Sequence, residues 1–407
     1  MTGSATFAPL AHRAFALAMA GVLVANLGNS VQAVGAAWQL TAAGEPADVV
    51  ALVQTALNLP ILLLALPAGA WADMFERRRI ILAAQGLMLL LSLLLAALVM
   101  AGEPPAAAVI ALTALLACGI AVFGPAMGAS IRGTVPAAQL AAAVALNILI
   151  FNLARAAGPA LGGAIVSGGG ALAAFVAAAA SYLAAIAIFS RWRPAPPNDP
   201  GPPRERRALR AMVAEGLGHA AGSREIRTIL LRAAAFTLGG AAAWALMPLV
   251  AADLLGRGPG VYGLLLGALG LGAVIGAASA TFFRSRHSAE AITRAAGMIY
   301  GLAVIGVALQ PGLAAMLALL VLAGAGWVQA LSGFSVSAQL WAPREAVGRV
   351  VALASAVTFG GIALGSWLWG HFAESFGVDG ALLASGAAMM VLPLLGLLLP
   401  MPAHEAP

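Results

Sequence analysis

The sequence contains very few of the residues on which disulfide-bonded proteins, metalloproteins and soluble enzymes depend. It has one cysteine, Cys118, which cannot form an intramolecular disulfide, and its five histidines show no zinc-ligand spacing. Charged residues make up 9% of the chain, whereas ordinary soluble domains contain roughly 25%. These absences exclude a soluble globular enzyme, and the sequence predicts neither a cofactor nor a metal site.

Lysine is missing as well, so that all 21 basic residues are arginines. The formal net charge of +6 could suggest a nucleic-acid partner. Here, however, the arginines occur in short clusters between long apolar stretches, a pattern that indicates orientation in a membrane, and we expect no nucleic-acid partner. The sequence also lacks a Walker phosphate loop, which excludes ATP as the energy source within this chain.

Apolar residues, by contrast, make up 62% of the chain. A helix needs about 20 apolar residues to cross the bilayer core. Charges, prolines and glycines divide the sequence into twelve stretches of about that length, which we predict to be transmembrane helices. They are residues 15–40, 48–70, 80–101, 106–128, 141–166, 171–190, 228–252, 260–283, 292–309, 313–339, 347–371 and 380–400.

The charges between these stretches alternate along the chain. Most arginines, among them Arg77, Arg132, Arg191 and Arg284, follow an even-numbered stretch, whereas the gaps after odd-numbered stretches hold mainly carboxylates. Because positively charged loops remain in the cytoplasm, this alternation predicts that both termini are cytoplasmic. The first apolar stretch is too long for a secretory signal, so we expect it to be an uncleaved helix.

Residues 191–227 form the longest polar segment, and its proline-rich part is followed by Arg204-Glu205-Arg206-Arg207. We predict a linker here, between an N-terminal half at 1–190 and a C-terminal half at 228–407. The linker is either a solvated tether or a site that recruits a partner. The two halves resemble each other, since residues 69–79 superpose on residues 276–286, as expected for a six-plus-six repeat.

Several motifs resemble those of the major facilitator superfamily. Gly69, Asp73, Arg77 and Arg78 match its signature between spans two and three, although Met74 and Glu76 stand where the family usually has arginine and glycine. Three further segments are similar to the branch that contains the enterobactin exporter, of the transmembrane secretion effector type. They are Asn26-Leu27-Gly28, Phe151-Asn152-Leu153-Ala154-Arg155 and Gly158-Pro159-Ala160-Leu161-Gly162-Gly163.

The resemblance implies an all-α integral membrane protein with the major facilitator fold, in which twelve transmembrane helices form two pseudo-symmetric six-helix halves. It also implies a monomer in the bacterial inner membrane. In this family Asp73, with its neighbours Gly69, Arg77 and Arg78, would latch the cytoplasmic side against the eleventh span. Gly158 and Pro159 belong to a segment that resembles an antiporter signature, which favours export.

Polar side chains inside the apolar stretches are the candidates for substrate contact. Arg155 lies about 22 Å into its stretch at a rise of ~1.5 Å per residue, close to the predicted depth of Gln54. It either contacts an anionic or carbonyl-rich substrate or is a structural arginine satisfied by Gln54 and backbone carbonyls. The complete set of predicted cavity residues is Asn26, Gln32, Gln54, Asn58, Asn147, Asn152, Arg155, Trp244, Trp327, Gln329 and Ser332.

No apolar stretch holds a carboxylate near the membrane midplane. Proton coupling is therefore implied by the resemblance alone, with Asp48 and Glu374, at span ends, as candidate coupling groups; Asp48 could equally cap its helix. The sequence predicts a secondary active transporter that exports a small amphipathic molecule, such as a drug-like compound or a siderophore, by alternating access. Its partners would be this substrate, membrane lipid and protons. A nutrient importer, or a membrane receptor or scaffold, is the alternative.

Overall fold

The computed structural model describes residues 7–193, 218, 222–343 and 346–402. Within these ranges the chain is helical and contains no strand. The long helices of the N-terminal half are α2 (Arg13–Ala42), α3 (Ala47–Met74), α4 (Arg77–Ala101), α5 (Ala106–Ser130) and α6 (Leu140–Arg191). The C-terminal half contains α8 (Arg224–Gly240), α9 (Ala242–Ala245), α10 (Met247–Leu249), the π-helix η4 (Val250–Leu254), α11 (Pro259–Arg284), α12 (Ala289–Ala308), α13 (Leu313–Trp341), α14 (Val347–Val391) and α15 (Leu395–Leu398).

Nine helices in the described part of the chain are long and apolar enough to cross a membrane. Two of them, α6 and α14, each comprise two crossings, because Gly169 and Gly170 interrupt α6 and Gly377 interrupts α14. Gly170 has φ 67° and Gly377 has φ 80°, a backbone conformation that glycine adopts without steric cost. We call the parts of α6 and α14 before and after these glycines the first and second arms.

The remaining crossing is discontinuous. The segment from Arg224 to Leu254 is divided into α8, α9, α10 and η4, and none of these pieces alone is long enough to span a bilayer. Together with the double crossings of α6 and α14, this segment completes the twelve spans that the sequence predicts. The prediction of a continuous seventh span at 228–252 is wrong, because the helix breaks after Gly240.

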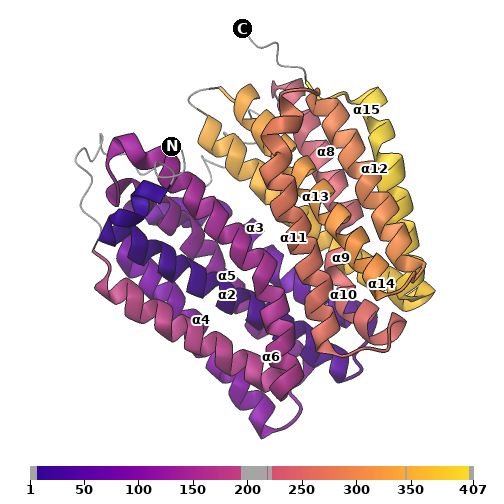
Figure 1. Ribbon diagram of the computed structural model, residues 1–407, viewed down its shortest axis with the longest axis horizontal. Helices are drawn as coiled ribbons and strands as arrows, with labels where there is room; N and C mark the ends of the chain where they lie inside the picture. The colour runs from indigo at the N-terminus through magenta and orange to yellow at the C-terminus, as the bar shows by residue number, and fades with distance from the viewer. Residues whose placement is uncertain (1–6, 194–217, 219–221, 344–345, 403–407) are drawn as a thin grey trace.

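The two halves lie side by side (Figure 1), and α11 of the C-terminal half packs on α6 of the N-terminal half. Inside the N-terminal half, α2 packs closely on the second arm of α6. Gly21, Gly28 and Gly35 face this arm, and a Cβ atom at any of the three would approach Phe189, Ser181 or Ala174 to within 2.8 Å. Such small-residue stripes let helices approach closely where lipid provides no hydrophobic driving force.

The helix ends define two faces of the molecule. At one face α2 and α8 begin and α3, α5 and α11 end. We call it the arginine-rich face, because it holds Arg13, Arg77, Arg132, Arg224 and Arg284. The face at the other ends of the helices is the opposite face. The predicted linker at 191–227 falls mostly on residues 194–217 and 219–221, outside the described residues.

Candidate substrate site

Arg155 and Trp244 bring the two halves together within the membrane. Arg155 lies in the first arm of α6, fifteen residues after Leu140, and so about 22 Å from the arginine-rich end of the helix. Its guanidinium carbon lies 4.9 Å from the centroid of the Trp244 ring in α9, across the interface. A cation–π contact of this kind contributes about 0.5–2 kcal/mol.

The guanidinium of Arg155 has no hydrogen-bond or ion-pair partner among the described residues. Its five N–H donors are therefore available to a ligand. The alternative that Gln54 satisfies Arg155 is wrong for this structure, because the side-chain oxygen of Gln54 lies 3.5 Å from the Asn58 amide instead. The Asn58 amide also donates to the backbone oxygen of Gln54, at 2.7 Å.

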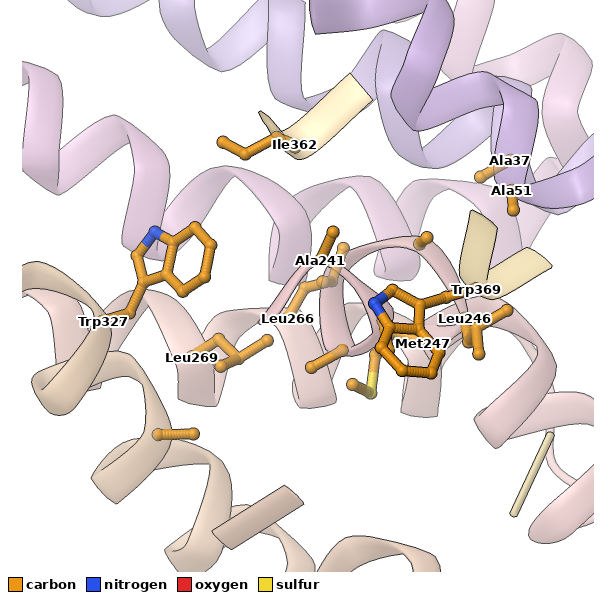
Figure 2. Packing of buried hydrophobic residues seen from close by; sticks show 14 of the residues in the cluster. Ala37, Ala51, Ala241, Leu246, Met247, Leu266, Leu269, Trp327, Ile362 and Trp369 are labelled. Atoms are coloured by element: carbon orange, nitrogen blue, oxygen red, sulfur yellow. The ribbon is translucent and has the colours of Figure 1, made fainter. Parts of the chain in front are cut away.

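Trp244 is the half-buried edge of an aromatic cluster in the C-terminal half. Its ring centroid lies 6.1 Å from that of Trp327, which in turn lies 5.4 Å from Tyr300 and 5.3 Å from Phe236. Trp327 is only 1% exposed, so the prediction that it lines the cavity is wrong: it packs behind Trp244. Trp327 and Trp369 lie on either side of Ala241, next to the break in the seventh span (Figure 2).

Two other predicted cavity residues, Gln32 and Gln329, point into the interior of their own halves, and these two predictions are wrong. Gln32 is fully buried and accepts a 2.6 Å hydrogen bond from Ser92 of α4. Gln329 of α13 donates to Gly276 O of α11 at 3.0 Å. Ser332 of α13 is partly exposed and accepts a 3.3 Å hydrogen bond from Arg284 of α11. Each polar side chain satisfies a contact between neighbouring helices.

The remaining amides make local contacts. Asn26 donates to Val22 O at 2.8 Å and Asn152 donates to Ile148 O at 2.9 Å, each one turn earlier in its helix. Asn147 is partly exposed. Asn152 precedes Arg155 by three residues, and so lies next to it on the helix surface.

The motif that contains Gly158 and Pro159 forms part of the contact between the halves. A Cβ atom at Gly158 would lie 2.4 Å from Ser30 of α2, whereas Pro159 O would be 2.6 Å from a Cβ at Gly263 of α11. One side of this segment therefore packs against its own half and the other against the C-terminal half. The segment is therefore tightly packed on both sides.

A glycine stripe on α11 extends this contact in both directions along the helix. Gly260, Gly263, Gly267 and Gly270 lie three or four residues apart and all face the first arm of α6. We call this contact the α6–α11 seam. Toward the arginine-rich face the seam opens, since Leu149, seven residues before Ala156 on the same side of α6, is 50% exposed.

The second contact between the halves joins α3 and the first arm of α14. Thr55 donates to Ala363 O at 2.8 Å, and a Cβ atom at Gly370 would lie 2.5 Å from Ala51. At the opposite face the carboxylate of Glu374 accepts a 3.0 Å hydrogen bond from Ala47 N, the first residue of α3. Negative charge is favourable at a helix N-terminus, so Glu374 holds the halves together there.

Asp48 does not cap α3. The residue at the N-cap position is Pro46, and Asp48, in the first turn, accepts a 2.7 Å hydrogen bond from Val49 N. The backbone of Asp48 lies close to Gly370, where a Cβ atom would come within 3.0 Å of the Asp48 Cα. Both candidate coupling carboxylates thus lie where the halves meet at the opposite face.

The predicted gate at the arginine-rich face is described only in part. Asp73 lies in the last turn of α3, but its side chain is outside the described residues. Gly69 has no atom within 4 Å of its Cβ position. Arg77 donates to Ala129 O of α5 at 3.0 Å, and Arg78 donates to Phe189 O and Ser190 O at the end of α6. Both arginines therefore satisfy the carbonyls of helix C-termini.

Replacing Arg78 with alanine should lower the melting temperature in detergent, because the substitution removes two charge-assisted hydrogen bonds. Each such bond contributes about 1.5–3 kcal/mol to the free energy of unfolding. Arg79→Ala is the matched control. Arg79 pairs with Glu76 at 2.6 Å while its side chain is 84% exposed, and exposed pairs contribute ~0–1 kcal/mol. Equal melting temperatures for the two variants would contradict the capping role of Arg78.

The residues that sequence reasoning missed are those that support the break in the seventh span. Tyr300, Trp369 and Ser385 each donate a hydrogen bond to a carbonyl beside it. The pair Gly239-Gly240 in a predicted span was the available signal, because consecutive glycines weaken a helix.

Twelve membrane crossings in two six-helix halves, with a charged and aromatic site between them, are the architecture of an integral membrane transporter. Residues 4–407 match the model of the transmembrane secretion effector family. The chain belongs to this family, and so to the transporters of the major facilitator superfamily, which are secondary transporters.

Similar proteins and structures agree with this assignment. The chain is 27% identical to the multidrug efflux pump Tap of Mycolicibacterium fortuitum over 94% of its own length and 95% of that protein. It is also 27% identical to the uncharacterized MFS-type transporter YfiS of Bacillus subtilis, over 89% and 86% of the two chains. The crystal structure of the nucleoside transporter NupG has the same fold, with a TM-score of 0.78 at 10% identity, covering 94% of this chain and 98% of that one.

Proposed function

We propose that this protein exports a small amphipathic molecule from the cytoplasm, with the arginine-rich face on the cytoplasmic side of a bacterial inner membrane. The positive-inside rule supports this orientation. The α6–α11 seam is packed toward the opposite face and exposed toward the arginine-rich face, so this state would load substrate from the cytoplasm. The functional unit is a monomer in lipid, with residues 191–227 linking the halves at 1–190 and 228–407.

The observation that carries this proposal is Arg155, which lies beside Trp244 and has no polar partner in the described ranges of the chain. A half-buried guanidinium favours ligands with carboxylate, phenolate or carbonyl oxygens. The ring of Trp244 favours an aromatic or other apolar body. Drug-like acids and catecholate siderophores combine both features. The naming of similar proteins as multidrug efflux pumps supports export of such compounds.

Vesicles of defined orientation test the direction of transport. Inverted membrane vesicles with an acidic lumen, and hence an outwardly directed proton gradient, should accumulate 9-anthracenecarboxylate, an aromatic anion, and a protonophore should stop this accumulation. Right-side-out vesicles energised in the physiological direction should not accumulate it. Accumulation only in right-side-out vesicles would identify an importer and overturn the proposal.

We further propose that protons drive export through Glu374, because protonation would remove the charge that binds Ala47 N and would release the opposite face. Glu374→Gln is then expected to abolish uphill transport while sparing substrate exchange. Asp48→Asn is the matched control, since the Asp48 side chain bonds only its own neighbour among the described residues.

The two variants separate the candidate coupling groups, provided that both reach the membrane in equal amounts. Loss of uphill transport in Asp48→Asn, with Glu374→Gln unaffected, would assign coupling to Asp48. Uphill transport in both variants would exclude a side-chain carboxylate at the opposite face as the coupling group.

A further inference from the structure

The break in the seventh span exposes backbone carbonyls inside the membrane. In a continuous helix the oxygens of Leu238, Gly239 and Gly240 would accept hydrogen bonds from the N–H groups four residues later. Here Gly240 ends α8, and the Trp244 N–H bonds to Ala241 O at 3.1 Å instead. Carbonyls without a donor are costly in a membrane, so the break needs replacement donors.

Three side chains from three different spans supply these donors. The Trp369 indole N–H, in the first arm of α14, donates to Leu238 O at 2.9 Å. The Ser385 hydroxyl, in the second arm of α14, donates to Gly239 O at 2.6 Å. The Tyr300 hydroxyl of α12 donates to Gly240 O at 2.5 Å. Three consecutive carbonyls are thus bonded from three directions.

The surrounding glycines show how closely these elements are fitted. A Cβ atom at Gly365, one turn before Trp369, would lie 2.5 Å from Leu238 O. A Cβ atom at Gly240 would lie 2.7 Å from the ring of Trp327. The break therefore has the backbone of α14 on one side and the aromatic cluster on the other, and neither leaves room for an added methyl group.

Trp244 follows directly after this break, in the four-residue helix α9. Its ring contacts Trp327 in its own half and Arg155 across the interface. The Nε1 atom of Trp244 is buried and has no hydrogen-bond partner within the part of the chain that the structure describes. The indole N–H of Trp244 does not fix the ring, so the orientation of the ring depends on the backbone that carries it.

We propose that Tyr300, Trp369 and Ser385 are positioning residues for the substrate site: by bonding the three carbonyls at the break, they hold the Trp244 ring against Arg155. The effect on substrate binding rests on the proposed function. The placement of Trp244 does not, because it can be measured in the protein without ligand. It assigns a role in substrate recognition to residues that lie behind the site and do not contact the ligand.

A ligand-free spectroscopic experiment tests the placement of Trp244. The protein is labelled with 5-fluorotryptophan, and the ¹⁹F resonance of Trp244 is assigned by its loss in Trp244→Phe. Tyr300→Phe, which removes one oxygen atom, and Ser385→Ala should shift or broaden this resonance, as Arg155→Leu should. Ser385→Thr, which keeps the hydroxyl, should restore it.

Ser92→Ala is the matched control. Ser92 is equally buried and bonds both Gln32 and Phe175 O, but it lies in the N-terminal half. A merely structural role for the three donors predicts lower melting temperatures with an unchanged Trp244 resonance. That result in Tyr300→Phe, Trp369→Phe and Ser385→Ala, each still folded, would overturn the proposal.

Binding measurements then separate this proposal from the proposed function. Tyr300→Phe should raise the Kd of 9-anthracenecarboxylate about fivefold to tenfold, and the same substitution should have no effect in a Trp244→Ala background, because the two residues act through one ring. Full additivity of the two substitutions would contradict the positioning role. If the Trp244 resonance responds as expected but the wild-type protein does not bind the probe, the positioning role stands and the proposed substrate chemistry is wrong.

Discussion

Replacing Arg155 with leucine is expected to weaken the binding of 9-anthracenecarboxylate by about 10- to 100-fold. Hydrogen bonds to a charged group contribute about 1.5–3 kcal/mol, and each 1.4 kcal/mol corresponds to about tenfold in affinity. Arg155→Lys should fall between wild type and leucine, since lysine keeps the charge but offers no planar pair of donors. Binding is measured by the fluorescence of the probe in detergent.

The melting temperature of Arg155→Leu should stay within a few degrees of the wild-type value. The only partner of the guanidinium among the described residues is the Trp244 ring, so leucine leaves no buried polar group without its bond. The cation 9-(aminomethyl)anthracene is the control ligand, and its affinity should not fall. An unchanged Kd for the anion in a folded Arg155→Leu variant would remove this residue from the substrate site.

The second large effect is expected in the α6–α11 seam. Gly263→Ala should reduce transport more than tenfold, because the new Cβ atom would lie 2.6 Å from Pro159 O and 2.8 Å from the Gly163 Cα. Both neighbours are backbone, which cannot move aside without shifting a helix. The opposite face then cannot close, and the carrier is held in its other orientation.

Gly267→Ala, one turn further along α11, is the matched control. Its Cβ atom would lie 3.4 Å from that of Ala160, an ordinary contact distance. Spin labels at the opposite face report the distance between the halves by pulsed electron resonance. They replace Glu103, in the loop between α4 and α5, and Asp379, just after the Gly377 interruption of α14, as Glu103→Cys and Asp379→Cys. We expect a longer distance for Gly263→Ala and a wild-type distance for Gly267→Ala. Identical distributions in both variants, with transport retained, would show that the seam tolerates an added methyl group.

The fold could be predicted from sequence because membrane insertion is governed by properties that a sequence displays directly. Runs of apolar residues and the alternation of arginines set the number of spans. The break after Gly240 could not be located in this way, because it depends on donors from Tyr300 and Ser385, which are 60 and 146 residues away from their acceptors in the chain.

The substrate site could be predicted only in part, for a similar reason. A polar side chain in a membrane helix must face either a cavity or another helix, and hydropathy does not distinguish the two. Gln32 and Gln329 bond to neighbouring helices of their own halves, whereas Arg155 faces Trp244 across the interface. The distinction rests on the rotation of each helix about its axis, which tertiary packing fixes.

The unpaired guanidinium also has a kinetic consequence. A carrier without cargo must enclose this bare charge whenever it passes through an occluded intermediate, and enclosing an uncompensated charge is costly. An anionic cargo supplies the counter-charge and lowers that barrier. Exchange of cargo across the membrane should therefore run faster than net release, and the idle protein should cycle slowly, which limits the dissipation of the ion gradient in cells that have nothing to expel.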